Sequence, residues 1–292
     1  MTLKDFITEV YCLTDDVYKK LIKRIGKLRK RGFQPKLSDS EIITMELVGE
    51  YLGFHKDQSL WKYFKHNMRD LFPYIGSRSS FVKQPANLWN IKQILHEEIV
   101  SCYFNNSDLH VVDGFPIPIC HYCRSTFCKS FKGKADYGYC AAKDEKYYGF
   151  KGHIIVDSNG VIKTFTFATP TVDERVALID ICKNLKGTLL GDKGYIKKEL
   201  SEELAEYGID LQTPMRKNMI EKRPKWFLKF IRSKRKVVET VISQLCKIFS
   251  IQNTRTRDLW HLTNRMARKI LAHNICTLIN LKHGFDILKV EH

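Results

Sequence analysis

The order of short apolar runs between residues 109 and 212 most constrains what this chain can fold into. The first three runs have strand-like lengths, and a hairpin-type turn, Asp157-Ser158-Asn159-Gly160, separates the second from the third. Helical and strand-like segments then alternate, which predicts an α/β fold with a mixed sheet and helices on both faces. The expected elements are strands at 109–112, 147–156 and 161–168, a helix at 173–185, a strand at 188–190, a helix at 197–207 and a strand at 209–212.

Helical periodicity dominates the chain before residue 85. Apolar residues recur at helical spacing from Val17 to Leu28 beneath a basic surface, and Ser38 with Glu41 has the spacing of a capping box. The prolines, glycine and serines of residues 73–85 predict a loop. The expected domains are an all-helical N-terminal domain at 1–85, a linking helix within 86–107, the sheet-containing domain at 108–255 and a C-terminal helix at 256–292.

The charge balance indicates a polyanionic partner. With 49 Lys and Arg against 32 Asp and Glu, the net charge is +17 and the pI is about 9.4, so nucleic acid is the first partner to consider. No apolar run approaches the roughly 20 residues that a membrane-spanning helix needs, and the N-terminus lacks the pattern of a secretion signal. We therefore expect a cytoplasmic protein without a membrane partner. Nine cysteines, an odd number, then predict reduced thiols rather than a disulfide framework.

Three acidic residues form the candidate site. Asp113 and Asp192 each stand where an apolar run gives way to glycine, and Glu239 lies beside the apolar stripe of a helix expected at 226–249. Taken singly, each Asp also fits a turn or a helix cap, and Glu239 also fits a surface pair with Arg235. Together they fit a site that holds two Mg²⁺ or Mn²⁺ ions roughly 3.5–4 Å apart for phosphodiester chemistry.

Four ordered segments resemble the DDE transposases of bacterial insertion sequences, closest to the branch numbered nine-eight-two. They are Asp113 within residues 111–120, the run 148–153, Asp192 within residues 189–195, and Glu239 within residues 235–244. The resemblance implies a ribonuclease-H-like catalytic core with Asp113 on the first strand, Asp192 after the fourth and Glu239 on a late helix. The separations between these three acids along the chain also fit the family.

The sequence departs from this pattern around the glutamate. Related transposases often carry a Tyr, Arg, Glu, Lys series, whereas here Arg232 stands at the Tyr place and Cys246 at the Lys place. Ten basic residues still accompany one acid between residues 216 and 236, interleaved with aromatic residues, so this segment predicts a DNA contact or, alternatively, a solvated face. The expected DNA-binding residues are Lys151, Arg216, Lys217, Arg232, Arg235 and Lys236.

Two further groups leave alternatives open. Cys120, Cys123, Cys128 and Cys140 contain one close pair, where zinc sites usually have two, so their spacing gives zinc little support. His153 fits either an approach to the metals or a hydrogen-bonded core position, and Lys151 would share its strand face.

The sequence therefore predicts a transposase that binds the terminal inverted repeats of its element, cleaves a strand and joins it to target DNA. Phosphate contacts do not read sequence, so the helical domain at 1–85 is the expected DNA-binding domain that recognises the ends. A homodimer or higher oligomer is expected, because two DNA ends must be held together. The alternatives are a metal-dependent nuclease that does not join strands and an inactive DNA-binding relic.

Overall fold

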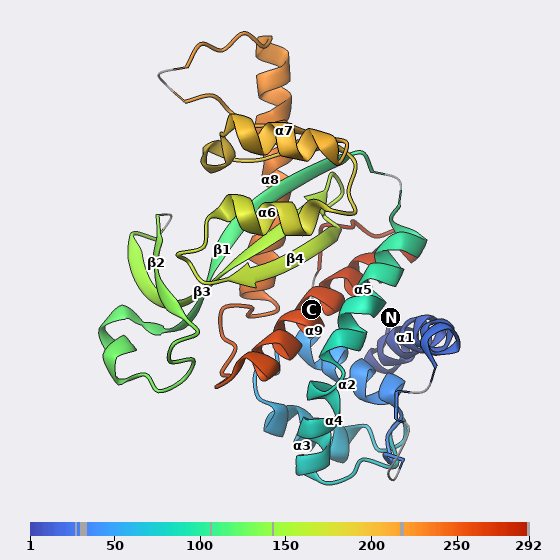
Figure 1. Cartoon of the computed structure of the whole chain (residues 1–292). Coiled ribbons are helices and arrows are strands. Elements are labelled where there is room, and N and C mark those ends of the chain that lie inside the picture. The colour runs from blue at the N-terminus through green and yellow to red at the C-terminus, as the bar shows by residue number, and fades with distance from the viewer. Residues whose placement is uncertain (27, 30–33, 106, 142, 217–218, 291–292) are drawn as a thin grey trace. The chain divides into compact units, whose positions relative to one another are not determined.

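The computed structural model describes the chain except residues 27, 30–33, 106, 142, 217–218 and 291–292 (Figure 1). It divides into two compact units. The helical unit comprises Met1–Tyr103 and Lys247–His292, and the sheet unit comprises Phe104–Cys246. The helix expected as a linker and the C-terminal helix both belong to the helical unit. Within the described residues, none of the helices combines the length and the apolar character of a membrane span.

The helical unit is built around its last helix, which packs against α2, α4 and α5 and is buried from Asn264 to Ile279. A helix buried on all sides is a core element, so the rest of the unit depends on it. The helices of this unit are α1 (Leu3–Ile25), α2 (Asp39–Tyr51), α3 (Asp57–Asn67), α4 (Arg78–Ala86), α5 (Trp89–Tyr103) and α9 (Leu259–Lys282).

Local capping defines where two of these helices begin. The predicted capping box of α2 is confirmed, because Ser38 Oγ accepts a hydrogen bond from the Glu41 N–H at 3.1 Å and Glu41 Oε2 accepts one from the Ser38 N–H at 2.6 Å. The loop predicted for residues 73–85 is wrong in its second half, which forms α4. Ser77 caps this helix at its start, and Pro85 lies in its last turn.

Paired charges are buried where α2, α5 and α9 meet. Arg268 of α9 is 2% exposed, and it donates hydrogen bonds to Glu46 at 2.9 Å and to Glu50. Lys269, fully buried, pairs with Glu50, and Lys92 of α5 pairs with Glu46. Burial lowers the pKa of Lys269 to about 8, while the charge of Glu50 opposes that shift. Each buried charge therefore depends on a partner from another helix.

The described residues of the sheet unit form a six-stranded mixed sheet in the order β2-β3-β1-β5-β6, with β4 also paired to β3. Strand β3 is antiparallel to β1, β2 and β4, whereas β5 runs parallel to both β1 and β6. This is the ribonuclease-H-like arrangement predicted from the sequence, so the fold class is confirmed. The strands are β1 (Leu109–His121), β2 (Asp136–Cys140), β3 (Glu145–Asp157), β4 (Ile162–Ala168), β5 (Gly187–Leu190) and β6 (Ile209–Gln212).

Helices α6 (Glu174–Cys182) and α7 (Lys198–Glu206) cover one face of this sheet (Figure 1). Their apolar residues join Val112 of β1 and Ile155 of β3 in a single buried cluster, which includes Leu178 and Leu204. Helix α8 (Lys225–Lys247) follows β6 in the chain and buries one stripe of its side chains, namely Ile231, Val238, Val241 and Leu245.

Two strand predictions differ from the structure. β1 does not end at residue 112 but continues to His121, paired with β3 except at an irregularity between Pro118 and Cys120. Pro116 and Pro118 are tolerated because β5 pairs with β1 only as far as Val111, which leaves one edge of the later residues outside that ladder. The short strand β2, which pairs with β3, was not predicted from the sequence.

The buried charges yield a stability prediction. Replacing Arg268 by Met leaves Glu46 and Glu50 short of a partner in a buried site, so Arg268→Met should lower the free energy of unfolding by about 3–5 kcal/mol. Urea denaturation followed by circular dichroism measures it. Arg69→Met is the matched control, since Arg69 is exposed and has no ion pair with any described residue. Equal denaturation midpoints for the two variants would show that the buried pairs contribute little.

Candidate active site

The parallel pairing of β1 and β5 sets Asp113 beside the turn that carries Asp192. Val111 pairs with Leu190 at the last step of this ladder, and each aspartate lies two residues further along its chain. Asp113 continues along β1, and the alternation of that strand keeps it on the face to which Val111 belongs. Asp192 follows the end of β5 and begins the turn at Lys193–Tyr195. Asp113 remains within β1, where it pairs with Ile154 of β3, so it does not mark a strand end as the sequence suggested.

Asp113 faces away from α6 and α7. Its neighbour Val112 packs into the cluster formed with those helices, so the alternation of the strand turns Asp113 to the opposite face. The charges of two α8 residues, Arg235 and Glu239, change the pKa of Asp113, so this helix lies near the acid. Glu239 is exposed, as expected for a residue beside the buried stripe of α8. Within the described chain, no ion pair joins Glu239 to Arg235.

The surroundings of Asp113 change its pKa. Burial raises it to about 6, the hydrogen bond from the Gly114 N–H and the charge of Arg235 lower it, and the charges of Asp192 and Glu239 raise it. The Gly114 N–H lies 2.8 Å from Asp113 Oδ1. Two further carboxylates, one after β5 and one on α8, therefore act on Asp113, and the charge of Arg235 opposes their effect.

The donor chemistry of the site suits a hard divalent cation. Carboxylate oxygens are the usual ligands of Mg²⁺, which binds to one or two carboxylates and fills its other positions with water and phosphate oxygens. Among the described residues, no group of three or more His, Cys, Asp or Glu side chains is gathered closely enough to hold a metal ion. The structure thus brings Asp192 and Glu239 within electrostatic reach of Asp113 without gathering the three carboxylates into one coordination shell. A cation bound to Asp113 would relieve the repulsion that acts on it.

Asp192 is held by the turn that follows β5. Its Oδ1 accepts a hydrogen bond from the Gly194 N–H, so the helix-cap interpretation of Asp192 also applies. A Cβ at position 194 would lie 2.8 Å from Asp192 Oδ1 and 3.8 Å from Glu174 Oε2, so glycine allows both carboxylates to approach the turn. The buried Tyr195 lies nearby, and burial followed by the charges of Glu174, Asp113 and Asp192 raises its pKa.

Glu174 is a residue of this region that the sequence analysis missed. It lies in the first turn of α6 and forms an ion pair with Lys151 of β3. An acid at the start of a predicted helix is explained by the helix dipole alone, so the sequence offers no reason to assign Glu174 to the site. Its contact with Lys151 arises only when α6 packs against the sheet. Lys151, expected as a phosphate contact, is thus engaged by an acid on the face of the sheet opposite Asp113.

His153 occupies a buried position on the same strand face as Lys151. It is 2% exposed, and its Nδ1 has no hydrogen-bond partner in the described chain. Burial, followed by the charge of Lys151, lowers the pKa of His153 to about 4, so the imidazole is neutral at physiological pH. Of the two alternatives for His153, the core position is therefore correct about burial, but the expected hydrogen bond is missing at Nδ1 among the described residues.

The expected DNA-binding residues of α8 and the preceding loop are mostly accessible. Arg216, Arg232 and Lys236 are exposed. Arg235 is partly buried, and its Nε has no hydrogen-bond partner among the described residues. Lys217 lies outside the described residues.

The cysteine cluster does not gather as a metal site in the part of the chain that the structure describes. Cys120, Cys123, Cys128 and Cys140 are all free thiols. Burial and the neighbouring Cys128 raise the pKa of Cys120 to about 11, so this thiol stays protonated at neutral pH.

The raised pKa of Asp113 yields a pH-dependent prediction. The pKa of Asp113 in the folded protein, about 6, exceeds the ordinary value of 3.8. In the metal-free protein the ionised carboxylate therefore lowers the free energy of unfolding above pH 6, and this cost is largely gone by about pH 4. Asp113→Asn should therefore stabilise the metal-free protein by about 1–2 kcal/mol at pH 8 and little at pH 4, with partial exposure limiting the gain. Urea denaturation with chelator measures both values.

The control for this prediction is Asp180→Asn. Asp180 is an exposed residue of α6 that pairs with Lys183, so its replacement should leave the pH dependence unchanged. A destabilised Asp113→Asn variant at pH 8 would contradict the electrostatic account of the site.

Comparison with known proteins identifies the family. The family model described as Transposase DDE domain matches residues 105–259, more than half of the 292 residues. Among solved structures, the cryo-EM piggyBac transposase synaptic complex with hairpin DNA shares 11% identity at a TM-score of 0.49, covering 99% of this chain and 75% of that one. The crystal structure of the Mos1 mariner paired end complex with Mn shares 10% identity at a TM-score of 0.22, covering 88% and 100%. None of the curated proteins matches. On the match to the family model, this chain belongs to the DDE transposase domain family.

Proposed function

We propose that this protein is an insertion-sequence transposase that cleaves a DNA strand at the ends of its element and joins the freed 3′ hydroxyl to target DNA. In this proposal Asp113, Asp192 and Glu239 hold two Mg²⁺ or Mn²⁺ ions. The observation that carries it is the pairing of β1 with β5, because it sets Asp113 beside the turn that carries Asp192, whose charge raises the pKa of Asp113. The branch numbered nine-eight-two remains part of the proposal.

The three carboxylates have distinct surroundings that suit this role. Bound metal ions would activate the attacking oxygen and stabilise the leaving oxygen of the phosphodiester. Asp113 is well enclosed, and its pKa of about 6 leaves it mostly ionised at pH 7 and above. Asp192 is oriented by the Gly194 N–H, whereas Glu239 is exposed on α8, so this side of the site is open to an incoming strand.

The N-terminal half of α8 supports a DNA path to this site. It carries basic residues, and Trp226 and Phe230 are 70% and 38% exposed, which argues against a buried role for these aromatic rings. Basic side chains that follow phosphates beside an exposed aromatic ring suit the binding of a strand with accessible bases. Because the same helix carries Glu239 about two to four turns later, DNA bound along it would be led toward the carboxylates.

Lys151 and Arg235 are proposed to contact phosphate near the metals. Arg235 already offsets the charge on Asp113. Lys151 is paired with Glu174 on the other face of the sheet. A phosphate that approaches past the edge of β1 would give the Lys151 ammonium group a second anionic partner.

The proposed working form is a homodimer or higher oligomer, because two element ends must be held together.

The proposal is tested with purified protein and labelled DNA that carries the ends of its element. Wild-type protein with Mg²⁺ or Mn²⁺ should cut at the ends and give joined product, and chelator should abolish both. Asp192→Asn and Glu239→Gln should each lower the rate more than about 100-fold while leaving DNA binding largely intact, because they remove metal ligands and no DNA-facing cation.

Asp210→Asn is the control for these variants, since Asp210 lies on β6 and its side chain accepts from Gln212. It should retain wild-type activity. Cutting without joining would favour a nuclease, and binding without metal-dependent cutting would favour a DNA-binding relic. Normal cleavage by Asp192→Asn would refute the assignment of the site.

A further inference from the structure

We propose that α4 and the first residues of α5 form the surface with which this protein reads the base sequence of duplex DNA. The inference rests on the proposed function, because a transposase must find the ends of its element, and it names the residues that would recognise them. It is independent of the carboxylates, which belong to the other unit of the chain.

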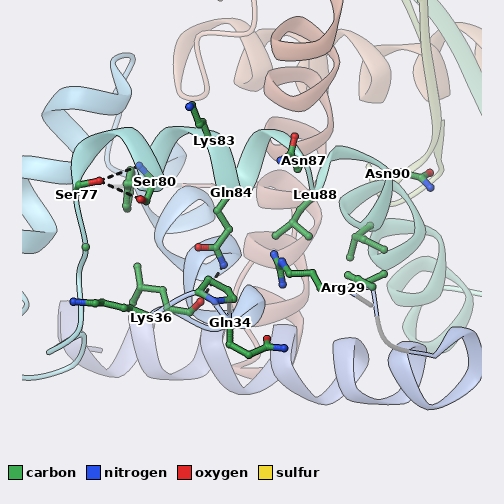
Figure 2. A pocket seen from close by; sticks show the side chains of 16 residues that line it. Arg29, Gln34, Lys36, Ser77, Ser80, Lys83, Gln84, Asn87, Leu88 and Asn90 are labelled. Carbon is green, nitrogen blue, oxygen red and sulfur yellow. Dashed lines mark hydrogen bonds between the residues drawn. The ribbon is translucent and has the colours of Figure 1, made fainter. Parts of the chain in front are cut away.

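One exposed stripe along α4 and the start of α5 carries side chains that can hydrogen-bond to bases. Ser80, Lys83, Asn87 and Asn90 are exposed and follow one another at spacings of three or four residues, so they lie along one side of the helix. Asn87 keeps right-handed helical dihedrals, φ −76° and ψ −8°, between α4 and α5. Figure 2 shows Lys83 and Asn87 projecting from the side of the helix opposite Gln84.

The opposite side of α4 anchors it to the helical unit. Phe81 and Leu88 are each 3% exposed. Gln84 Nε2 donates to Asp39 Oδ1 at 3.0 Å, and Asp39 also accepts two hydrogen bonds from Arg29. A surface held by buried apolar contacts and satisfied polar groups presents its outward side chains in fixed positions, as recognition requires.

The chemistry of the stripe suits the major groove. Asn pairs with adenine through two hydrogen bonds, Lys donates to guanine, and Ser contacts either type of base edge. No Asp or Glu occurs between Asp70 and Glu97, so no acid in this stretch would repel the phosphates. The exposed side chains of the stripe are polar, which favours a hydrated, charged partner over an apolar protein surface.

Two hollows with basic linings include residues of the stripe. The first, of about 900 Å³, is lined by all four stripe residues, and its other cations are Lys36 and Arg29, which is paired with Asp39 (Figure 2). The other, of about 610 Å³, has one acid in its lining, Asp57, which is paired with the buried Arg265. The Lys and Arg residues that line the second hollow are Lys56, Arg78, Lys83, Arg255 and Arg265.

The position of Lys83 relates the hollows to the stripe. Lys83 is the only described residue that lines both of these hollows, so the stripe adjoins each of them. Lys36, Arg78 and Lys83 form no ion pair with any described acid, so their charges are available to a ligand. Phosphates flank the bases of a major groove, so the available charges of Lys36, Arg78 and Lys83 near the stripe suit a helix seated in that groove.

The experiment is a selection from random-sequence duplex DNA with the full-length protein. Wild-type protein should enrich a sequence motif, and the Asn87→Ala and Asn90→Ala double variant should lose preference at one or more base pairs of that motif. Its affinity for the selected duplex should fall about 5- to 100-fold, while its affinity for unrelated duplex changes less than about twofold. Lys83→Ala should weaken binding and reduce its salt dependence.

Matched controls come from exposed residues of the same unit outside the stripe. Asn67→Ala in α3 and Lys20→Ala in α1 should select the wild-type motif. Equal thermal unfolding curves for all variants would establish that the helical unit is intact. An unchanged motif for the double variant would overturn the inference, as would a wild-type protein that selects no motif.

The same selection separates this inference from the proposed function. Asp192→Asn should select the wild-type motif although it cannot cleave. A wild-type protein that selects a motif through α4 but never cleaves DNA would support the inference and contradict the proposed catalytic role.

Discussion

The parallel pairing of β1 with β5 is the constraint on which the candidate site depends. Val111 and Leu190 are far apart in the sequence, and their pairing sets Asp113 of β1 beside the turn after β5 that carries Asp192. A slip of one residue in this register would move that turn along β1 and so change the position of Asp192 relative to Asp113. The crossover through α6, which packs on the face opposite Asp113, allows β5 to run parallel to β1 and leaves the face of Asp113 free of that helix.

Charged side chains are buried in both units, with opposite consequences. In the helical unit, Arg268 and Lys269 meet Glu46 and Glu50 in buried pairs, so these charges are compensated and serve the packing of α9. In the sheet unit, Asp113 is partly buried near two further carboxylates, and its pKa rises to about 6 because burial and repulsion outweigh the Gly114 hydrogen bond and the attraction of a nearby arginine. A partly buried carboxylate beside like charges is costly for stability and is typical of a site that binds a cation.

Much of the fold was predictable because its signals are local. Strand-length apolar runs, the turn at residues 157–160 and the cap at Ser38 all depend on neighbouring residues, and they correspond to β3, β4 and α2. The strand β2 and the helix α4 were missed because tyrosine, glycine, serine and proline give weak or contrary local signals there. Motif and spacing indicated the three carboxylates, whereas the approach of Glu174 to Lys151 depends on how α6 packs on the sheet, which no local pattern encodes.

The most direct test of the clustered carboxylates is an NMR titration of the Asp113 carboxyl carbon in metal-free protein, with wild type, Asp192→Asn and added Mg²⁺. The account predicts a pKa of about 6 for wild type, a lower value in Asp192→Asn, and a fall when Mg²⁺ binds, because each change removes or offsets negative charge near Asp113. An Asp113 pKa near the ordinary 3.8 that responds to neither the substitution nor Mg²⁺ would contradict the central claim.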